Sequence, residues 1–299
     1  MIKNKLINHY LDKSFECYSS FRNKKAIEYV DKALFLDENN VECLLSKGLF
    51  YSALFDRENS FKCFDLAMEI EPNSCNILYQ KGLALMNLDE YDLALDCFEE
   101  ILNFDSDNID VLRQVGLCHY YMEDYCNSII VFQRIMSFCP NDLDSIICIS
   151  GCHVGLNDFE NALKYVDYAL DIDNMSSMAL SRKSDILSKM GDYHAAINLM
   201  DRCLELNPDN LSYQISRCSL LVSIGSFEEA LIGFEKVHDT YFDDYNLVDL
   251  FYLKYGQALQ RMGKNDEALV LYDEFLIKYE EFPKDDIIAE RDKVLGQLH

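Results

Sequence analysis

The chain has 299 residues, and its 52 acidic side chains outnumber its 27 lysines and arginines, which gives a formal net charge of −25. Because 49% of the residues are hydrophobic, the charge excess does not indicate disorder, and the length suffices for one large or two ordinary domains. So acidic a surface disfavours general binding to nucleic acid or anionic lipid. The small numbers of Pro (4) and Gly (11) disfavour a turn-rich β-sandwich or barrel.

The N-terminal residues predict neither secretion nor membrane insertion. Met1–Tyr10 carries two lysines but no apolar run of a signal peptide, and no stretch of about 18 apolar residues follows anywhere in the chain. The 12 cysteines are spread along the chain rather than placed at disulfide spacings. We therefore expect a cytoplasmic protein whose cysteines are reduced.

The sequence repeats itself every 34 residues. The segments that begin at Leu44 and Leu78 align without a gap at this offset, and Pro72, Pro140 and Pro208 are two periods apart. Small residues recur at the same interval, at Ala26, Ser60, Ala94, Ser128, Ala162, Ala196 and Ala230. Large residues recur four positions later, at Val30, Phe64, Phe98, Phe132, Val166, Met200 and Phe234. A period of this length indicates a helical-repeat protein.

The repeat frame predicts a single solenoid domain over residues 1–299. Its units are 7–40, 41–74, 75–108, 109–142, 143–176, 177–210, 211–248 and 249–282. The seventh unit is four residues longer than the others, near Tyr241–Asn246. Residues 285–299 are expected to form a C-terminal capping helix.

Each unit has the pattern of two helices joined by a tight turn. In the third unit Leu78, Gly82 and Leu85 share one helical face, and the turn at Asp89-Glu90 precedes a second apolar face. Glycines recur at one position of the first helix, where the missing side chain lets two helices approach closely: Gly48, Gly82, Gly116 and Gly256. The fold class is therefore predicted to be all-α.

This pattern resembles the tetratricopeptide repeat family over nearly the whole chain. The second unit carries the family's small-and-large signature at Leu44, Gly48, Tyr51, Ser60, Phe64, Ala67 and Pro72. No unit contains Trp, and the first and seventh units match less well. The resemblance implies a right-handed superhelical α-solenoid of helix-turn-helix pairs, in which the first helices line a concave groove.

Carried over to this chain, the family's groove positions predict a partner-binding surface. We expect it to comprise Leu45, Leu49, Tyr79, Leu83, Arg113, Leu117, Tyr120, Arg182, Lys189, Lys254 and Arg261. Acidic residues exceed basic ones by two in the groove of the first four units, and basic residues exceed acidic ones by two in the last four. The expected partner is thus a protein or peptide, apolar or aromatic toward the N-terminal half and acidic toward the C-terminal half.

The function that follows is a non-enzymatic interaction scaffold without cofactor. Two other interpretations of the groove remain open: the leucines could simply belong to the core, and the same surfaces could serve structural self-association. Some relatives hold a chaperone's C-terminal carboxylate in a Lys and Asn clamp, but the corresponding positions here, among them Leu11 and Phe15, do not form it.

A metal-binding or enzymatic role would have to centre on the segment from Cys118 to His153. Cys148 and Cys152 are four residues apart, and His119 and His153 occupy equivalent places in neighbouring units. However, Cys118 and Cys152 stand where the family places small buried residues, and the chain contains no C-x-x-C motif. We therefore predict no metal site and no catalytic residues.

Overall fold

The described part of the protein is entirely helical, as the sequence predicts. The structure, a computed structural model, describes residues 2–20, 22–72, 74–238, 245–279 and 285–297, which contain seventeen helices and no strand. None of the helices in these ranges is both long and apolar enough to cross a bilayer. The chain divides into two compact units, residues 1–156 and 157–299.

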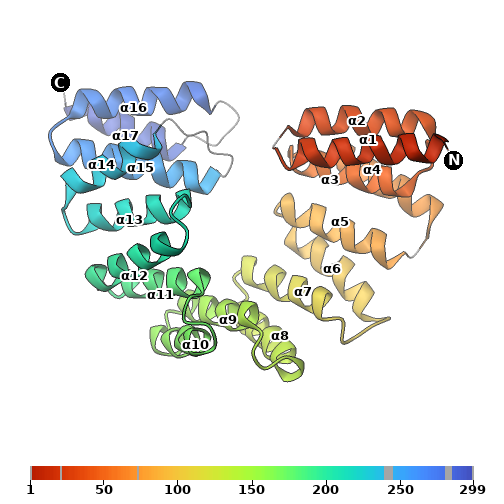
Figure 1. The fold of residues 1–299 in the computed structure, drawn as a ribbon, viewed down its shortest axis with the longest axis horizontal. Coiled ribbons are helices and arrows are strands. Elements are labelled where there is room, and N and C mark those ends of the chain that lie inside the picture. The colour runs from red at the N-terminus through yellow and green to blue at the C-terminus, as the bar shows by residue number, and fades with distance from the viewer. Residues whose placement is uncertain (1, 21, 73, 239–244, 280–284, 298–299) are drawn as a thin grey trace. The chain divides into compact units, whose positions relative to one another are not determined.

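The first unit is a stack of nine helices in which each helix packs against the next (Figure 1). The first helices of neighbouring repeats also touch, as α3 and α5 do. The helices are α1 Ile2–Tyr18, α2 Asn23–Leu36, α3 Val41–Ser52, α4 Arg57–Ile70, α5 Cys75–Asn87, α6 Tyr91–Leu102, α7 Ile109–Tyr121, α8 Tyr125–Phe138 and α9 Leu143–Gly155.

The second unit repeats this arrangement with eight helices among the described residues. Its first helices α13 and α15 contact one another, and α17 packs on both α15 and α16. The helices are α10 Phe159–Ile172, α11 Ser177–Lys189, α12 Tyr193–Leu206, α13 Leu211–Ser223, α14 Phe227–Val237, α15 Tyr245–Arg261, α16 Asn265–Lys278 and α17 Asp285–Gln297. Both units are thus α-solenoids built from helix pairs.

The predicted 34-residue frames coincide with these helix pairs. Between residues 41 and 210 every frame holds two helices, and the boundary between the two units falls inside the fifth frame. That the whole chain forms one solenoid domain stays a prediction. Residues 239–244, which include most of the segment near the predicted insertion, lie outside the described residues, and so do 280–284 and 298–299.

Side-chain caps begin the helices at the same period. The first helices have polar N-cap residues whose side chains accept a hydrogen bond from the backbone N–H three residues on, which would otherwise be unpaired. These caps are Asn40, Asn108, Asp142, Ser176 and Asn210. Second helices are capped in the same way by Asp56, Asp124, Asp158 and Asp192. In these nine helices the local sequence therefore determines where the helix starts.

The turn between the two helices of a repeat requires one residue with positive φ. The residues in this conformation are Phe55, Asp89, Glu123, Asn157, Gly191, Gly225 and Gly263. The predicted turn at Asp89 is confirmed, and Asn157 and Gly191 adopt the same conformation in later repeats. Phe55 is the unfavourable case, because its φ of 56° strains a bulky residue while its side chain is 72% exposed and gains little from packing.

Close approach of two helices holds each repeat together. A Cβ placed on Gly82 would lie 2.6 Å from the ring of Phe98, and the same clash recurs between Gly48 and Phe64. The equivalent pairs are Gly116 with Phe132 and Gly256 with Tyr272. All four aromatic residues are fully buried. The recurring glycines of the first helices and the recurring large residues of the second helices are therefore two sides of one contact.

Repeats without this glycine adjust the contact in other ways. Ser14 and Ser184 occupy the glycine position, and the residues sixteen positions later are the smaller Val30 and Met200. In the seventh repeat Cys218 takes the position, and a Cβ on Gly233 of the facing helix would lie 2.3 Å from its Sγ atom. The space that one helix loses is thus supplied by the other.

Replacing Gly82 by Ala should lower the free energy of unfolding by about 1–3 kcal/mol, because the added methyl group overlaps the buried Phe98 ring. Chemical denaturation measures the change. The matched control is Gly296→Ala on α17, where a Cβ meets nothing within 4 Å and helix propensity favours Ala. Equal losses in the two variants would contradict the packing argument.

Replacing Phe55 by Gly should raise the free energy of unfolding by about 0.5–1 kcal/mol, since Gly adopts positive φ without steric cost. The thermal unfolding midpoint reports the gain. Phe104→Gly is the control, because Phe104 is similarly exposed at 69% but does not have positive φ, so that variant should lose stability. A loss in the Phe55 variant would show that its side chain makes a stabilising contact.

Candidate functional site

The predicted leucines of the second repeat lie beside a cavity of about 530 Å³. Leu45 is only 5% exposed and belongs to the core, so it forms the floor of the cavity rather than a projecting anchor. Leu49 is half-buried and lines the same cavity. The core alternative therefore describes Leu45 better than the groove interpretation does. The lining residues come from α1, α3, α5 and the end of α4.

Tyr79 lines a second cavity, of about 310 Å³, which adjoins the first through Asn76. Its ring packs edge-on against the buried Phe98 at a centroid distance of 5.8 Å, so part of this tyrosine belongs to the core. Leu83 is half-buried and packs on the same core cluster, and Leu117 is half-buried as well. These side chains therefore present only a part of their surface to a partner.

Tyr120 belongs to a cluster of aromatic side chains in the fourth repeat. Its ring lies edge-on to Tyr121 and to Tyr125, with centroid distances of 5.7 Å in both cases. Tyr121 in turn stacks on Tyr91 of the preceding repeat at 5.1 Å. The tyrosines that follow the turns thus join neighbouring repeats as well as the two helices of one repeat.

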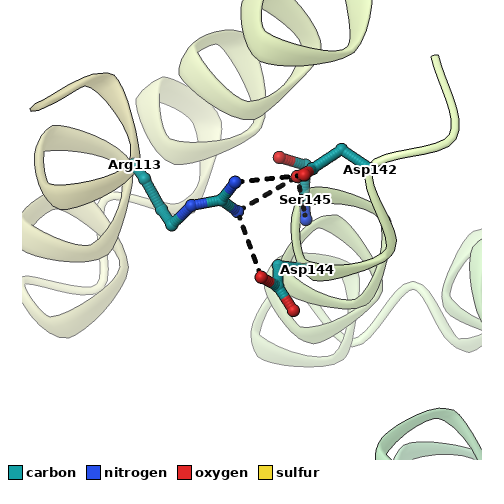
Figure 2. A network of polar contacts seen from close by, with 4 residues as sticks. All are labelled: Arg113, Asp142, Asp144 and Ser145. Carbon is teal, nitrogen blue, oxygen red and sulfur yellow. Dashed lines mark hydrogen bonds and ion pairs between the residues drawn. The ribbon is translucent and has the colours of Figure 1, made fainter. Parts of the chain in front are cut away.

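Arg113 is bound within the protein rather than presented to solvent. Figure 2 shows its guanidinium on α7 facing Asp142, the N-cap residue of α9. Nη1 donates to Oδ2 and Nη2 donates to Oδ1, both at 3.0 Å, and Nη1 lies 3.5 Å from Asp144. The backbone N–H of Ser145 also donates to Asp142, at 3.0 Å. Arg113 therefore links the first helices of two consecutive repeats.

The contact between Arg113 and Asp142 shifts the pKa values of both side chains so that each stays charged. The hydrogen bond to Asp142 raises the pKa of Arg113. Partial burial alone would raise the pKa of Asp142, but the hydrogen bonds from Arg113 and Ser145 outweigh it and hold that pKa below the usual 3.8. Both side chains are about one-fifth exposed, which makes the pair stronger than a surface ion pair.

The four predicted cations of the second unit differ from Arg113 in their surroundings. Arg182 is half-buried and Lys189 is exposed on α11, while Lys254 is half-buried and Arg261 is exposed on α15. None of the four makes a salt bridge with a described residue. Moreover, Nε of Arg182 is buried without a hydrogen-bond acceptor in the described part of the chain. Burial raises the pKa of Asp185 on α11, and the nearby Arg182 and Lys189 oppose this shift, so part of their charge is already used within the protein.

Lys254 and Arg261 share a cavity with a volume of about 910 Å³. Gln257 and Gln260 line it on the same helix, and Val222, Ile224 and Phe227 supply an apolar wall. Lys254 Nζ donates only a long hydrogen bond, of 3.4 Å, to Gln257 Oε1. The cavity thus combines two cations, the carboxylate of Glu290, two amides and an apolar surface.

Three features of these cavities were missed in the sequence. Glu71 lies at the end of a second helix, and Phe227 begins another. The groove positions of the family are on first helices and therefore include neither residue. Glu290 reaches the large cavity from the capping helix α17. The proline after Glu71 could have indicated this position in the sequence, because it marks where a second helix ends next to the following repeat.

The segment from Cys118 to His153 does not assemble a metal site in the structure. No three His, Cys, Asp or Glu side chains of the described residues come close enough to share an ion. Burial raises the pKa of Cys118 to about 12, so the thiol is protonated at neutral pH, whereas a metal ligand is a thiolate. The buried Cys152 Sγ lies 3.2 Å from Ser128 Oγ. These cysteines behave as small core residues.

Comparison with known proteins points to one family. A tetratricopeptide repeat model matches residues 41–74, 76–108 and 179–210, and a second model of the same description matches 251–281. A TPR repeat-containing protein of Methanocaldococcus jannaschii is 32% identical over 89 residues, which are 30% of this chain and 16% of that protein. The chain therefore spans only a small part of that relative.

Two solved structures share the fold. A tetratricopeptide repeat protein of Parabacteroides merdae matches with a TM-score of 0.65 and 16% identity, over 85% of this chain and 98% of that one. Yeast Tom70 matches with a TM-score of 0.70 and 16% identity, over 93% of this chain and 59% of its own. At this identity the likeness concerns the fold alone.

Replacing Arg113 by Gln should lower the free energy of unfolding by about 1 kcal/mol at pH 7, because it removes a partly buried bidentate ion pair. Since the folded pKa of Asp142 is depressed, this contribution is complete above the unfolded pKa near 4 and disappears as the pH falls through the folded pKa. Urea denaturation between pH 7 and 2.5 follows the difference between variant and wild type.

Lys164→Gln is the control, since its pair with Glu160 lies on an exposed helix surface and should contribute much less. Asp142→Asn should keep the N-cap while weakening the pair, and Asp142→Ala should lose both. A difference for Arg113→Gln that stays constant down to pH 2.5 would assign the effect to packing of the arginine stem instead.

Proposed function

Because this chain belongs to the tetratricopeptide repeat family, we propose that it is a non-enzymatic scaffold that binds a segment of another protein along its first helices. The partner is apolar or aromatic where it meets the first unit and acidic where it meets the second. Helical repeats of this kind present side chains of successive first helices to one ligand. The proposal includes a cytoplasmic location, supported by 12 cysteines that are all free thiols.

The proposal rests on one difference among the basic residues on the first helices of the second unit: some form ion pairs within the protein, and others do not. Lys183 and Arg217, also on first helices of the second unit, form ion pairs with Asp167 and Asp201 of the preceding second helices, at 2.7 and 2.5 Å. Lys189 and the other three predicted cations have no such pairs with described residues. Cations that the fold does not use for its own stability are the ones that a ligand can use.

The experiment is affinity purification with three versions of the full chain. Lys189→Glu combined with Arg261→Glu reverses two exposed charges of the proposed surface. Lys25→Glu combined with Lys32→Glu makes the same change in charge on the exposed part of α2, a second helix. We expect mass spectrometry to find partners that wild type and the α2 variant capture at equal levels and that the groove variant loses by about tenfold or more.

Thermal unfolding of the three proteins provides the stability control, because both double variants replace exposed side chains and should melt close to wild type. Light scattering across a concentration series tests the alternative of structural self-association. Equal capture by the groove variant and the α2 variant would reject the proposed surface. Self-association that the groove variant alone abolishes would replace the foreign partner with a second copy of the chain.

A further inference from the structure

The cavity beside Leu45 has an acidic rim and an apolar floor. Its volume is about 530 Å³, and its lining includes Glu42 and Glu71 but no Lys, Arg or His among the described residues. Both carboxylates are exposed, and neither has an ion-pair partner in the described part of the chain. A site that is lined by one sign of charge concentrates ligands of the opposite sign.

The first unit does not supply a compensating cation at its predicted groove. Arg113, the basic residue predicted there, is held by Asp142 and Asp144. The adjoining cavity, beside Tyr79, adds Asp110 to its rim, and this carboxylate also has no partner among the described residues. Acidic groups therefore lie at both of these adjoining cavities.

The floor of the first cavity suits a long aliphatic stem. Leu45 and Leu49 lie beneath it, and Phe15, which is 43% exposed, forms one wall. The amides of Asn76 and Gln80 line the same cavity and make no hydrogen bond within the described residues. An arginine or lysine side chain meets all of these features, because its methylene groups pack on apolar surface while its charged head reaches the carboxylates.

We propose that the first unit binds an extended segment of the partner in which arginine or lysine alternates with apolar residues. One basic side chain enters the cavity between Glu42 and Glu71 and packs against Phe15, and the next lies near Asp110. This inference rests on the proposed function and sharpens it, since it assigns positive charge to the part of the partner that meets the first unit.

Three fluorescein-labelled nonapeptides test the inference by fluorescence anisotropy with the full chain. They are threefold repeats of Leu-Arg-Ala, Leu-Gln-Ala and Leu-Glu-Ala. We expect the arginine peptide to bind, and the variant Glu42→Gln with Glu71→Gln to bind it about tenfold more weakly than wild type. The glutamine and glutamate peptides should show no dependence on Glu42 and Glu71.

The control for overall acidity is Glu99→Gln with Glu100→Gln, an equal change in charge on the exposed face of α6. This variant should bind the arginine peptide within about twofold of wild type. Equal weakening by the two double variants would show that the peptide senses only the net charge, and would overturn the inference. Absence of binding by the arginine peptide, or equally tight binding by the glutamate peptide at this site, would also overturn it.

Phe15→Ala separates the apolar wall from the charges. It should weaken the arginine peptide by about fivefold while urea denaturation shows whether the first unit remains folded. The proposed function has its own outcome, because the charge-reversed variant of Lys189 and Arg261 lies in the second unit. If that variant loses partners while Glu42 and Glu71 have no effect on any peptide, the inference fails and the proposed function stands.

Discussion

The fold depends on one steric constraint, the close contact between a small residue of the first helix, which is glycine in four repeats, and the buried residue sixteen positions later. In the second and third repeats a single added methyl group on Gly48 or Gly82 would overlap a phenylalanine ring. This contact sets the distance between the two helices of a repeat. With the helix pair fixed, the first helices of successive repeats lie next to each other, as the contacts between α3 and α5 and between α13 and α15 show.

Electrostatic contacts between repeats follow the same period but are not present in every repeat. Lys47 pairs with Asp31 at 2.7 Å, and equivalent pairs join Lys183 to Asp167 and Arg217 to Asp201. In the fourth and fifth repeats the basic position is instead the buried Val115 and Ile149. There the bidentate pair between Arg113 and Asp142 connects α7 to α9. In these two repeats a buried apolar residue therefore stands where other repeats have a paired Lys or Arg, and the pair between Arg113 and Asp142 links the repeats instead.

The sequence was sufficient to predict the helix pairs because each is determined by local rules. The turn at Asp89, the caps 34 residues apart at Asn108 and Asp142, and the glycine opposite an aromatic residue all appear as patterns of residue type. The burial of individual groove residues could not be predicted in this way. Leu45 and Leu49 look alike in the sequence, but only the packed structure shows that Leu45 is the more deeply buried.

Arg113 shows the same limit for charged residues. Its partner Asp142 is 29 positions away and was recognisable in the sequence only as a helix-capping residue. A carboxylate can accept from a backbone N–H and from a guanidinium at once, so its role as a cap did not exclude the ion pair. Glu71 was missed for a different reason, since second-helix ends were not counted among groove positions although one of them reaches the cavity.

Charge pairing also changes what the net charge of −25 says about ligands. A sum over groove positions counts Arg113 as equal to Arg261, yet the first is neutralised by two aspartates and the second makes no ion pair with a described residue. The field that a ligand meets is set by unpaired charges, because paired ones cancel at a distance of a few ångströms. By this measure the first unit presents Glu42, Glu71 and Asp110. The second presents Lys254 and Arg261 in a cavity that Glu290 also lines. A chain with a large acidic excess can therefore distinguish basic from acidic segments, since the distinction depends on which few charges the fold leaves without partners.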